Sequence, residues 1–166
     1  MKHLYIICGP MGVGKSTTCR ALKKLLAPCA FLDGDWCWDM EPFTVNEENK
    51  AMVMANIHHL LKSYLSNSGF QNVIFCWVIP GAGVLSDVLS GLKDIDFTVH
   101  TVALTCSEET LRRRIEGDVK AGLRTPDAAG RAISYLPLYD GMDIIKLSTD
   151  GMSPSEAAEA IVKISK

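Results

Sequence analysis

The feature that most constrains this sequence is a glycine-rich octapeptide near its start, Gly9 to Ser16, which follows the pattern G-x-x-x-x-G-K-[ST]. A short run of apolar and aromatic residues, Leu4 to Cys8, precedes it and predicts a buried strand. A stretch with helical spacing, Thr17 to Leu26, follows it and stops before Pro28. A strand, a glycine turn and a helix in this order predict a phosphate-binding loop, or P-loop.

The residue types of this octapeptide suit a polyphosphate ligand. Glycines let the backbone wrap around a phosphate with its N–H groups pointing inward, and the start of the next helix adds a positive dipole end. Lys15 is expected to reach the β and γ phosphates, and the Ser16 hydroxyl is expected to hold Mg²⁺. The sequence therefore predicts that ATP and Mg²⁺ bind through Gly9, Pro10, Met11, Gly12, Val13, Gly14, Lys15, Ser16 and Thr17.

Apolar runs and helical patterns alternate along the rest of the chain, which predicts an α/β fold with a parallel sheet covered by helices on both faces. The chain of 166 residues is long enough for one sizeable core and too short for two typical domains, so we expect a single domain over residues 1–166. Further strands are expected at Ala30 to Leu32, Val73 to Ile79, Phe97 to Leu104 and Ile144 to Leu147. Further helices are expected at Asn46 to Leu65, Val84 to Leu92, from Ser107, from about Pro126 to Leu138, and from Ser153.

Two carboxylates, Asp33 and Asp35, follow the second expected strand. The third expected strand ends at Pro80 without the acid that is usual in nucleotide-dependent switches and motors. If strand geometry continued to Asp35, both carboxylates would face the phosphates from the same side. One would then hold Mg²⁺ and the other would accept a proton from a substrate hydroxyl. A polar turn around Gly34 is the alternative interpretation.

Five of the six arginines lie close together in the second half of the chain: Arg112, Arg113, Arg114, Arg124 and Arg131. From Leu111 to Arg131, six basic and three acidic residues give a local charge of +3, although the whole chain carries −2. Phosphoryl transfer spreads negative charge over the γ-phosphate oxygens, which mobile guanidinium groups can neutralise. A solvated helix face with Glu–Arg pairs is the alternative for each arginine.

Together these motifs resemble those of the shikimate kinase and gluconate kinase group of small P-loop kinases, which is related to nucleoside monophosphate kinases and chloramphenicol phosphotransferase. The octapeptide, Asp33-Gly34-Asp35, Gly81-Ala82-Gly83 and the arginine-rich stretch carry the resemblance. The order of the expected elements resembles that of the group along the whole chain. The resemblance implies a five-stranded parallel sheet, an arginine-rich lid at about residues 112–131, and a substrate-side region at about residues 36–66.

The resemblance also implies roles for individual residues. Asp33 takes the place of the carboxylate on the magnesium side, and Asp35 that of the base for the substrate hydroxyl. Gly81 and Gly83 fall where shikimate kinases place a substrate loop. Arg114 corresponds to a lid arginine that covers the transferred phosphoryl group, which would make it catalytic together with Lys15 and Asp35. Arg112 or Arg113 is the alternative or additional arginine for this role, and Arg124 and Arg131 would assist from the second half of the lid.

The substrate-side region departs from the pattern of that group. Shikimate kinases and nucleoside monophosphate kinases place arginines there for anionic groups of the acceptor, but Trp36 to Tyr64 contains only Lys50 and Lys62. This departure disfavours shikimate and other strongly anionic acceptors. The segment from Trp36 to Phe43 offers aromatic surfaces and acids, which suit a neutral hydroxylated molecule such as a sugar, a nucleoside or an antibiotic. A packing role for Trp36 and Trp38 is the alternative.

The sequence therefore predicts an enzyme, an ATP-dependent kinase that transfers the γ-phosphate to a hydroxyl of a small molecule. A nucleoside monophosphate kinase and a nucleotide-dependent switch ATPase or GTPase without a small-molecule acceptor are the alternatives. The sequence does not contain the guanine-reading Asn-Lys-x-Asp pattern of a GTPase switch.

Bulk properties predict a cytoplasmic protein whose partner is the small-molecule acceptor. The longest apolar stretch is too short to cross a bilayer, and the first residues lack the apolar core of a signal peptide. A net charge of −2 indicates neither a nucleic-acid nor a membrane partner. Several of the six cysteines lie inside apolar strand-like runs, where they are expected to act as small buried apolar residues rather than as disulfides or zinc ligands. The protein is expected to be a monomer or a homodimer.

Overall fold

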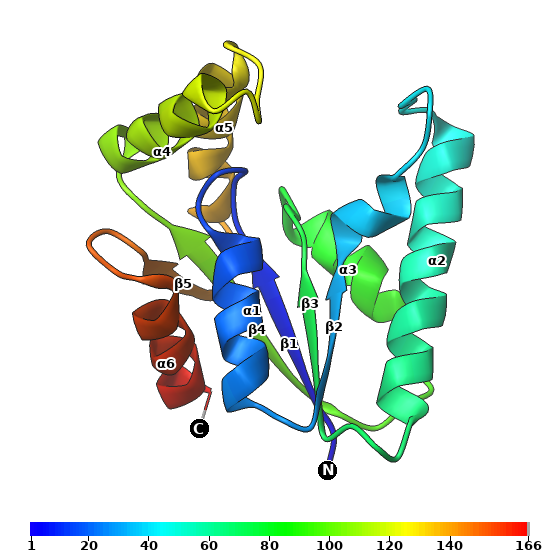
Figure 1. Ribbon diagram of the computed structural model, residues 1–166. Coiled ribbons are helices and arrows are strands. Elements are labelled where there is room, and N and C mark those ends of the chain that lie inside the picture. The colour runs from blue at the N-terminus through cyan, green and yellow to red at the C-terminus, as the bar shows by residue number, and fades with distance from the viewer. Residues whose placement is uncertain (166) are drawn as a thin grey trace.

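In the computed structural model, which describes residues 1–165, five parallel strands form one sheet with helices on both faces (Figure 1). Lys166, the last residue of the expected domain, lies outside the described residues. The strands are β1 (His3–Cys8), β2 (Cys29–Asp33), β3 (Asn72–Cys76), β4 (Thr98–Thr105) and β5 (Ile145–Ser148). Their order across the sheet is β2-β3-β1-β4-β5, and every neighbouring pair is parallel. The predicted α/β fold with a five-stranded parallel sheet is confirmed.

The described residues also form six α-helices and two short 3-10 helices, of which all but the last α-helix lie between strands. The α-helices are α1 (Lys15–Leu25), α2 (Glu47–Ser66), α3 (Ala82–Ser90), α4 (Glu108–Lys120), α5 (Ala128–Tyr135) and α6 (Pro154–Ile164). The 3-10 helices are η1 (Gly34–Trp38) and η2 (Leu136–Tyr139). No helix within residues 1–165 combines the length and the apolar character that a membrane span requires.

The side chains of β1 point alternately to the two faces of the sheet, and the core accordingly has two layers. Tyr5 and Ile7 face the side of the sheet covered by α1 and α6, where they share a cluster with Ile161. Leu4 and Ile6 face the other side, which α2 and α3 cover. Successive strand residues point to opposite faces, so a strand buried on both faces needs the continuous apolar run seen in this segment.

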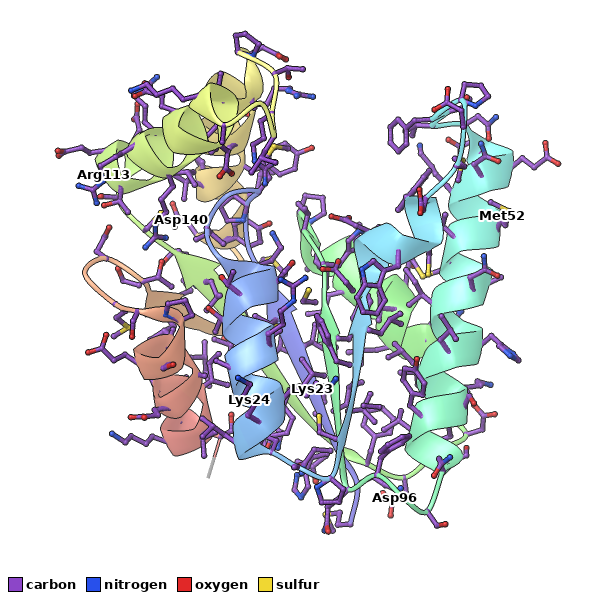
Figure 2. The ribbon with its side chains drawn as sticks, in the orientation of Figure 1. Lys23, Lys24, Met52, Asp96, Arg113 and Asp140 are labelled. Atoms are coloured by element: carbon purple, nitrogen blue, oxygen red, sulfur yellow. The ribbon has the colours of Figure 1, made fainter. Side chains whose placement is uncertain are left out.

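Polar caps fix the starts of several helices. Asn46, Ser107 and Ser153 accept hydrogen bonds from the backbone N–H groups of the first turns of α2, α4 and α6. Ser153 forms a complete capping box with Glu156, which satisfies two backbone donors reciprocally. At the other end of α1, Lys23 and Lys24 occupy the last turn, away from the phosphate loop (Figure 2). Their charges favour the negative end of the helix dipole.

The third strand is shorter than its apolar run suggests. We expected a strand from Val73 to Ile79, but β3 ends at Cys76. Ile79 has a positive φ of 42°, a conformation that strands do not use, and Pro80 has no N–H to donate. Trp77 and Val78 still lie beside the end of β1, because the Trp77 N–H donates to the carbonyl oxygen of Ile7 at 3.2 Å and the Gly9 N–H donates to that of Val78 at 3.4 Å. The chain turns away at Ile79.

All six cysteines lie within the described residues and are free. Four of them are buried, which agrees with the expectation that they act as small apolar residues.

Candidate active site

The Gly9–Ser16 loop connects β1 to α1 at the carboxyl edge of the sheet. Gly9, Gly12 and Gly14 have φ values of 142°, 79° and 103°, which residues with a side chain rarely adopt. A Cβ atom on Gly9 would also lie 2.5 Å from the carbonyl oxygen of Leu104 on β4. The shape of the loop therefore depends on glycine at these positions.

Lys15 extends its ammonium group over this loop. Its Nζ donates hydrogen bonds to the carbonyl oxygens of Gly9 and Pro10, both at 2.9 Å. Burial lowers the pKa of Lys15, while Cys76, Asp35 and Asp33 oppose this shift. The nearby carboxylates thus help to keep the amine charged at the mouth of the loop, where phosphate oxygens are stronger acceptors than the two carbonyls.

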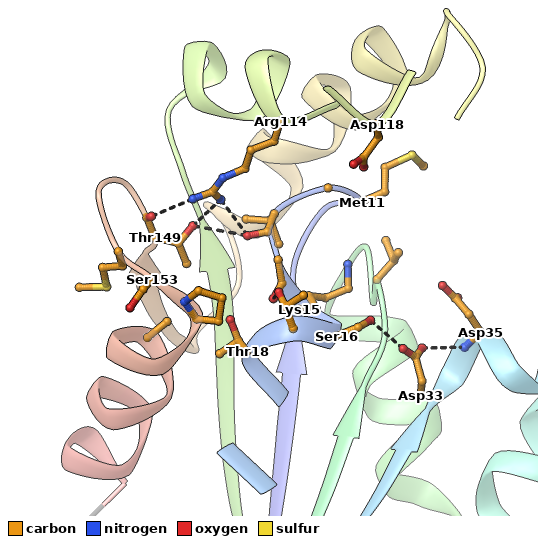
Figure 3. Close-up of a pocket in the computed structure, with 18 of the residues that line it drawn as sticks. Met11, Lys15, Ser16, Thr18, Asp33, Asp35, Arg114, Asp118, Thr149 and Ser153 are labelled. Carbon is orange, nitrogen blue, oxygen red and sulfur yellow. Dashed lines mark hydrogen bonds between the residues drawn. The ribbon is translucent and has the colours of Figure 1, made fainter. Parts of the chain in front are cut away.

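Ser16 and Asp33 form an oxygen-only pair beside the loop. Ser16 Oγ donates to Asp33 Oδ2 at 2.8 Å, and the backbone N–H of Asp35 donates to Asp33 Oδ1 at 3.2 Å (Figure 3). Mg²⁺ prefers oxygen ligands and is usually held by one or two protein groups together with phosphates and water. No group of three or more His, Cys, Asp or Glu side chains within residues 1–165 forms a self-contained metal site. The Ser16–Asp33 pair therefore fits Mg²⁺ that arrives with a nucleotide.

Asp35 does not continue the strand, so the expected same-face arrangement of the two carboxylates along a strand is wrong. Asp33 caps η1 by accepting a hydrogen bond from the Asp35 N–H, and the chain turns, as the alternative interpretation supposed. A Cβ on Gly34 would lie 2.6 Å from Cγ of Trp77, so only glycine fits this turn. Asp35 nevertheless faces the same cleft as Lys15 and Ser16.

The environment of Asp35 suits a group that takes up a proton. Partial burial raises the pKa of Asp35, and the charge of Asp33 adds to this rise. Lys15, the Trp77 side chain and Arg124 oppose it. A carboxylate with a raised pKa is a better proton acceptor than an ordinary aspartate.

A cleft of about 550 Å³ surrounds the loop, and we call it the phosphate cleft (Figure 3). The loop, β2, α4 and the β5–α6 connection all contribute to its walls. The lining includes most of the predicted nucleotide-binding residues. It also includes residues that the sequence did not single out, because they lie far from the octapeptide along the chain: Asp118, Thr149, Met152, Ser153, Pro154 and Ala157.

Two of the five predicted lid arginines line the phosphate cleft. Arg114 donates to the carbonyl oxygen of Val13 and to Oγ1 of Thr149, both at 2.9 Å, and to the carbonyl oxygen of Thr149 at 3.0 Å. Arg124 binds Asp118 at 2.9 Å. Arg114 is thus fixed beside the loop, and Arg124 stands farther along the same wall.

The other three arginines are exposed and do not line the cleft. Arg112 pairs with Glu108, and Arg131 pairs with Asp127, as expected for solvated helix faces. Arg113 lies on the outer side of α4 (Figure 2). Their contact with a bound nucleotide, and the closing movement of α4 and α5 that it requires, stay predictions.

A second pocket of about 550 Å³, which we call the aromatic pocket, adjoins the phosphate cleft. Asp35 lines both. The aromatic pocket is lined by Asp35, Trp36, Trp38, Asp39, Phe43 and Trp77. Trp36 was predicted beside the substrate, but Trp77 was missed because its apolar run indicated a buried strand. The pocket contains all three tryptophans of the chain.

Gly81 and Gly83 lie at the start of α3 and line neither cavity. A Cβ atom at either position would meet nothing within 4 Å. Close packing therefore does not require glycine at either position. Their role in a substrate loop stays a prediction.

Comparisons with known proteins agree with this geometry. Residues 6–125 match a family model described as an AAA domain, whereas no curated protein matches the sequence. The tunicamycin resistance protein of Deinococcus radiodurans has a similar structure, with a TM-score of 0.76 and 20% identity over 99% of this chain and 96% of that chain.

Two further solved structures are named as kinases. A gluconokinase from Sinorhizobium meliloti 1021 has a TM-score of 0.68 and 15% identity, over 98% of this chain and 93% of that chain. Shikimate kinase from Acinetobacter baumannii, in complex with shikimate, has a TM-score of 0.65 and 21% identity, over 99% and 92%. At these identities the likeness concerns the fold, and it confirms the predicted resemblance to small P-loop kinases at that level. The chain belongs to the AAA domain family, and it has the fold of the small P-loop kinases.

Proposed function

We propose that this protein is an ATP-dependent kinase that transfers the γ-phosphate to a hydroxyl group of a small molecule. One observation carries the proposal: Asp35 lines both the phosphate cleft and the aromatic pocket. A hydroxyl group held in the aromatic pocket would meet the end of a triphosphate beside a carboxylate that can accept its proton.

The proposed reaction needs few groups. The acceptor oxygen forms a bond to the γ-phosphorus, the bond from that phosphorus to the bridging oxygen breaks, and ADP leaves with the electron pair. The hydroxyl proton passes to Asp35. Lys15 and the N–H groups of the loop offset the phosphate charge. Ser16 and Asp33 would hold Mg²⁺, which supplies further positive charge at the β and γ phosphates.

The lining of the aromatic pocket argues against a nucleoside monophosphate as the acceptor. None of the described residues that line it is a lysine or an arginine, so nothing there would neutralise the phosphate of such an acceptor. The gluconokinase and shikimate kinase among the structural neighbours are named as kinases of small molecules, and the tunicamycin resistance protein is named for resistance to an antibiotic. These names support a small-molecule acceptor here.

We also propose a cytoplasmic location. The six free cysteines suit a reducing compartment, and ATP is the expected phosphoryl donor. The oligomeric state stays as predicted, a monomer or a homodimer.

The decisive experiment measures ATP turnover with and without a mixed library of small hydroxylated acceptors. We expect turnover to depend strongly on the acceptor, and Asp35→Asn to lower kcat by about 10²–10⁴-fold while ATP still binds. Asp96→Asn is the matched control, because Asp96 is exposed at the opposite end of the sheet (Figure 2). ATP turnover that no acceptor changes would indicate a nucleotide-dependent switch. Full transfer by Asp35→Asn would instead refute the assignment of the base.

A further inference from the structure

The segment that forms most of the aromatic pocket is strongly acidic. Residues 34–49 contain five acids and no lysine, arginine or histidine. These acids are Asp35, Asp39, Glu41, Glu47 and Glu48. The next basic residue, Lys50, is bound to Glu47 at 2.8 Å. A ligand that enters the aromatic pocket therefore meets two carboxylates, Asp35 and Asp39, in a lining that includes no lysine or arginine.

Asp39 is the one acid of this segment, besides Asp35, that lines the aromatic pocket. It is exposed, it lines the aromatic pocket, and its side chain makes no ion pair or hydrogen bond to any part of residues 1–165. Asp94, Asp118 and Asp127, by contrast, each pair with a lysine or an arginine. The carboxylate of Asp39 is therefore available to a ligand.

Large aromatic side chains stand exposed around Asp39. Trp36 is 56% exposed and Phe43 is 65% exposed, although side chains of this size are usually packed away from water. The rings of Trp38 and Phe43 lie 5.9 Å apart and are tilted by 53°. Indole faces bind organic cations through their negative quadrupole, and the effect is strongest for tryptophan. Aromatic faces beside an unpaired carboxylate are therefore a suitable receptor for an ammonium group.

We infer that the acceptor of this enzyme carries a protonated amine in addition to its hydroxyl group, as amino alcohols, amino sugars and aminocyclitols do. The ammonium group would lie against the tryptophans near Asp39, and the hydroxyl group would lie near Asp35. A neutral sugar would donate hydroxyl hydrogen bonds to Asp39 but would bring no charge to offset that of the carboxylate, and an anionic acceptor would be repelled. This inference rests on the proposed kinase function and specifies its acceptor.

The position of the phosphoryl group in the product follows from the same chemistry. An ammonium group has no lone pair and cannot attack phosphorus, so the new bond forms to the hydroxyl oxygen. The amine stays protonated throughout, and the only proton that moves is the hydroxyl proton, which passes to Asp35. The product would be a phosphate ester whose ammonium group keeps its positive charge.

The tryptophans themselves provide the assay. Because all three line the aromatic pocket, the intrinsic fluorescence of the protein reports on its occupation. The probes are amino alcohols, amino sugars and aminocyclitols, each paired with its N-acetyl counterpart, which has nearly the same shape without the charge. We expect the amine of at least one pair to bind roughly tenfold more tightly than the amide, with an advantage that shrinks as salt is added.

Variants distinguish recognition by Asp39 from a general effect of charge. Asp39→Asn should reduce the amine preference to about threefold or less, whereas Glu159→Gln, which changes the net charge equally on the exposed face of α6, should keep it. Loss of the preference in Asp39→Asn alone supports the inference. Equal or tighter binding of the amides in every pair, or no response to any amine, overturns it.

Turnover separates this inference from the function on which it rests. Turnover that depends on neutral acceptors and does not occur with amines would refute the inference that the acceptor carries an amine. It would leave the proposed kinase function standing. Turnover that no acceptor stimulates would refute the kinase itself.

Discussion

Asp33 and Asp35 are separated by a single glycine, yet their carboxylates are suited to different tasks. Asp33 is buried, and both of its oxygens already accept hydrogen bonds, from Ser16 and from the Asp35 backbone. Asp35 opens into the phosphate cleft and the aromatic pocket. The carboxylate of Asp33 is therefore held in place as an oxygen ligand for a cation, whereas that of Asp35 is free to exchange a proton.

The raised pKa of Asp35 predicts a pH dependence of catalysis. Burial, with help from the charge of Asp33, raises the pKa of Asp35 above that of an ordinary aspartate. Asp35 must be ionised to act as a base, so kcat should begin to fall at a higher pH than for an ordinary aspartate. A profile of kcat between about pH 4 and pH 8 tests this expectation. A kcat that stays flat down to the range of ordinary aspartates would contradict it.

The raised pKa of Asp35 also predicts how its ionisation affects the stability of the fold. A carboxyl group whose pKa is raised on folding binds its proton more readily in the folded state, so its ionised form destabilises the protein and this effect fades as the pH falls through that pKa. Asp35→Asn should therefore be more stable than the wild type near neutral pH, and the difference should shrink in acid. Melting temperatures of both proteins over the same pH range provide the measurement.

At the scale of elements, one side chain joins three segments around the phosphate cleft. Arg114 projects from α4 to the carbonyl oxygen of Val13 in the P-loop and to Thr149 after β5. Thr149 is only 3% exposed, so its acceptor groups have little other access to water. This contact, together with the buried Leu111 and Ile115 of the same helix, holds α4 over the loop.

Removal of the Arg114 side chain should weaken the fold as well as the reaction. We expect Arg114→Ala to lower the free energy of unfolding by about 2 kcal/mol, because buried acceptors lose a charged donor, and to lower turnover more than ATP affinity. Arg114→Lys should recover only part of the stability, since lysine lacks the planar fork. Arg113→Ala, on the exposed side of the same helix, should change stability by less than about 0.5 kcal/mol. Denaturant unfolding checks these values, and equal effects of the two alanine variants would refute the assignment.

Local features of the sequence were sufficient to predict most elements. The P-loop follows from glycines that the backbone conformation requires, and the strands follow from apolar runs that a sheet buried on both faces requires. The end of β3 was not predictable in this way, because the apolar pattern continues past Cys76 to Ile79 while the backbone turns. The turn at Asp35 depends on a hydrogen bond to Asp33, which periodicity does not reveal.

Contacts between distant segments account for the rest of the site. Arg114 and Thr149 are 35 residues apart in the sequence, and Trp77 reaches the aromatic pocket from the end of a different strand than Trp36. The sequence identified the chemical types that the site needs. It did not identify which of the clustered arginines face the cleft, because that depends on how α4 packs against the loop.

At the scale of the whole molecule, every strand leads into the site at its carboxyl end. β1 leads into the P-loop, β2 ends with Asp33, β3 leads to Trp77, β4 leads to α4, and β5 leads to Thr149. Ligand sites of open parallel sheets commonly lie at this edge. A bound nucleotide would therefore contact segments that belong to all parts of the sheet.

Nucleotide binding should consequently stabilise the domain as one unit. With ATP and Mg²⁺ at about 100 times the dissociation constant, the gain is about 2.7 kcal/mol, which corresponds to a rise in Tm of roughly 5–10 °C for a domain of this size. Removal of Mg²⁺ with a chelator should reduce the rise, and Lys15→Ala should abolish it. Thermal unfolding followed by circular dichroism checks this, and an unchanged Tm of the wild type with ATP and Mg²⁺ would contradict nucleotide binding.

The layout of the aromatic pocket has a consequence for how such an enzyme can diversify. Five of its six lining residues lie in one short segment, from Asp35 to Phe43, that follows β2. A few codon changes between Trp36 and Phe43, after the catalytic Asp35, would change the surface that meets the acceptor without disturbing the strands or the triphosphate site. Selection for a different acceptor can therefore act on this one surface segment while the catalytic framework is inherited unchanged.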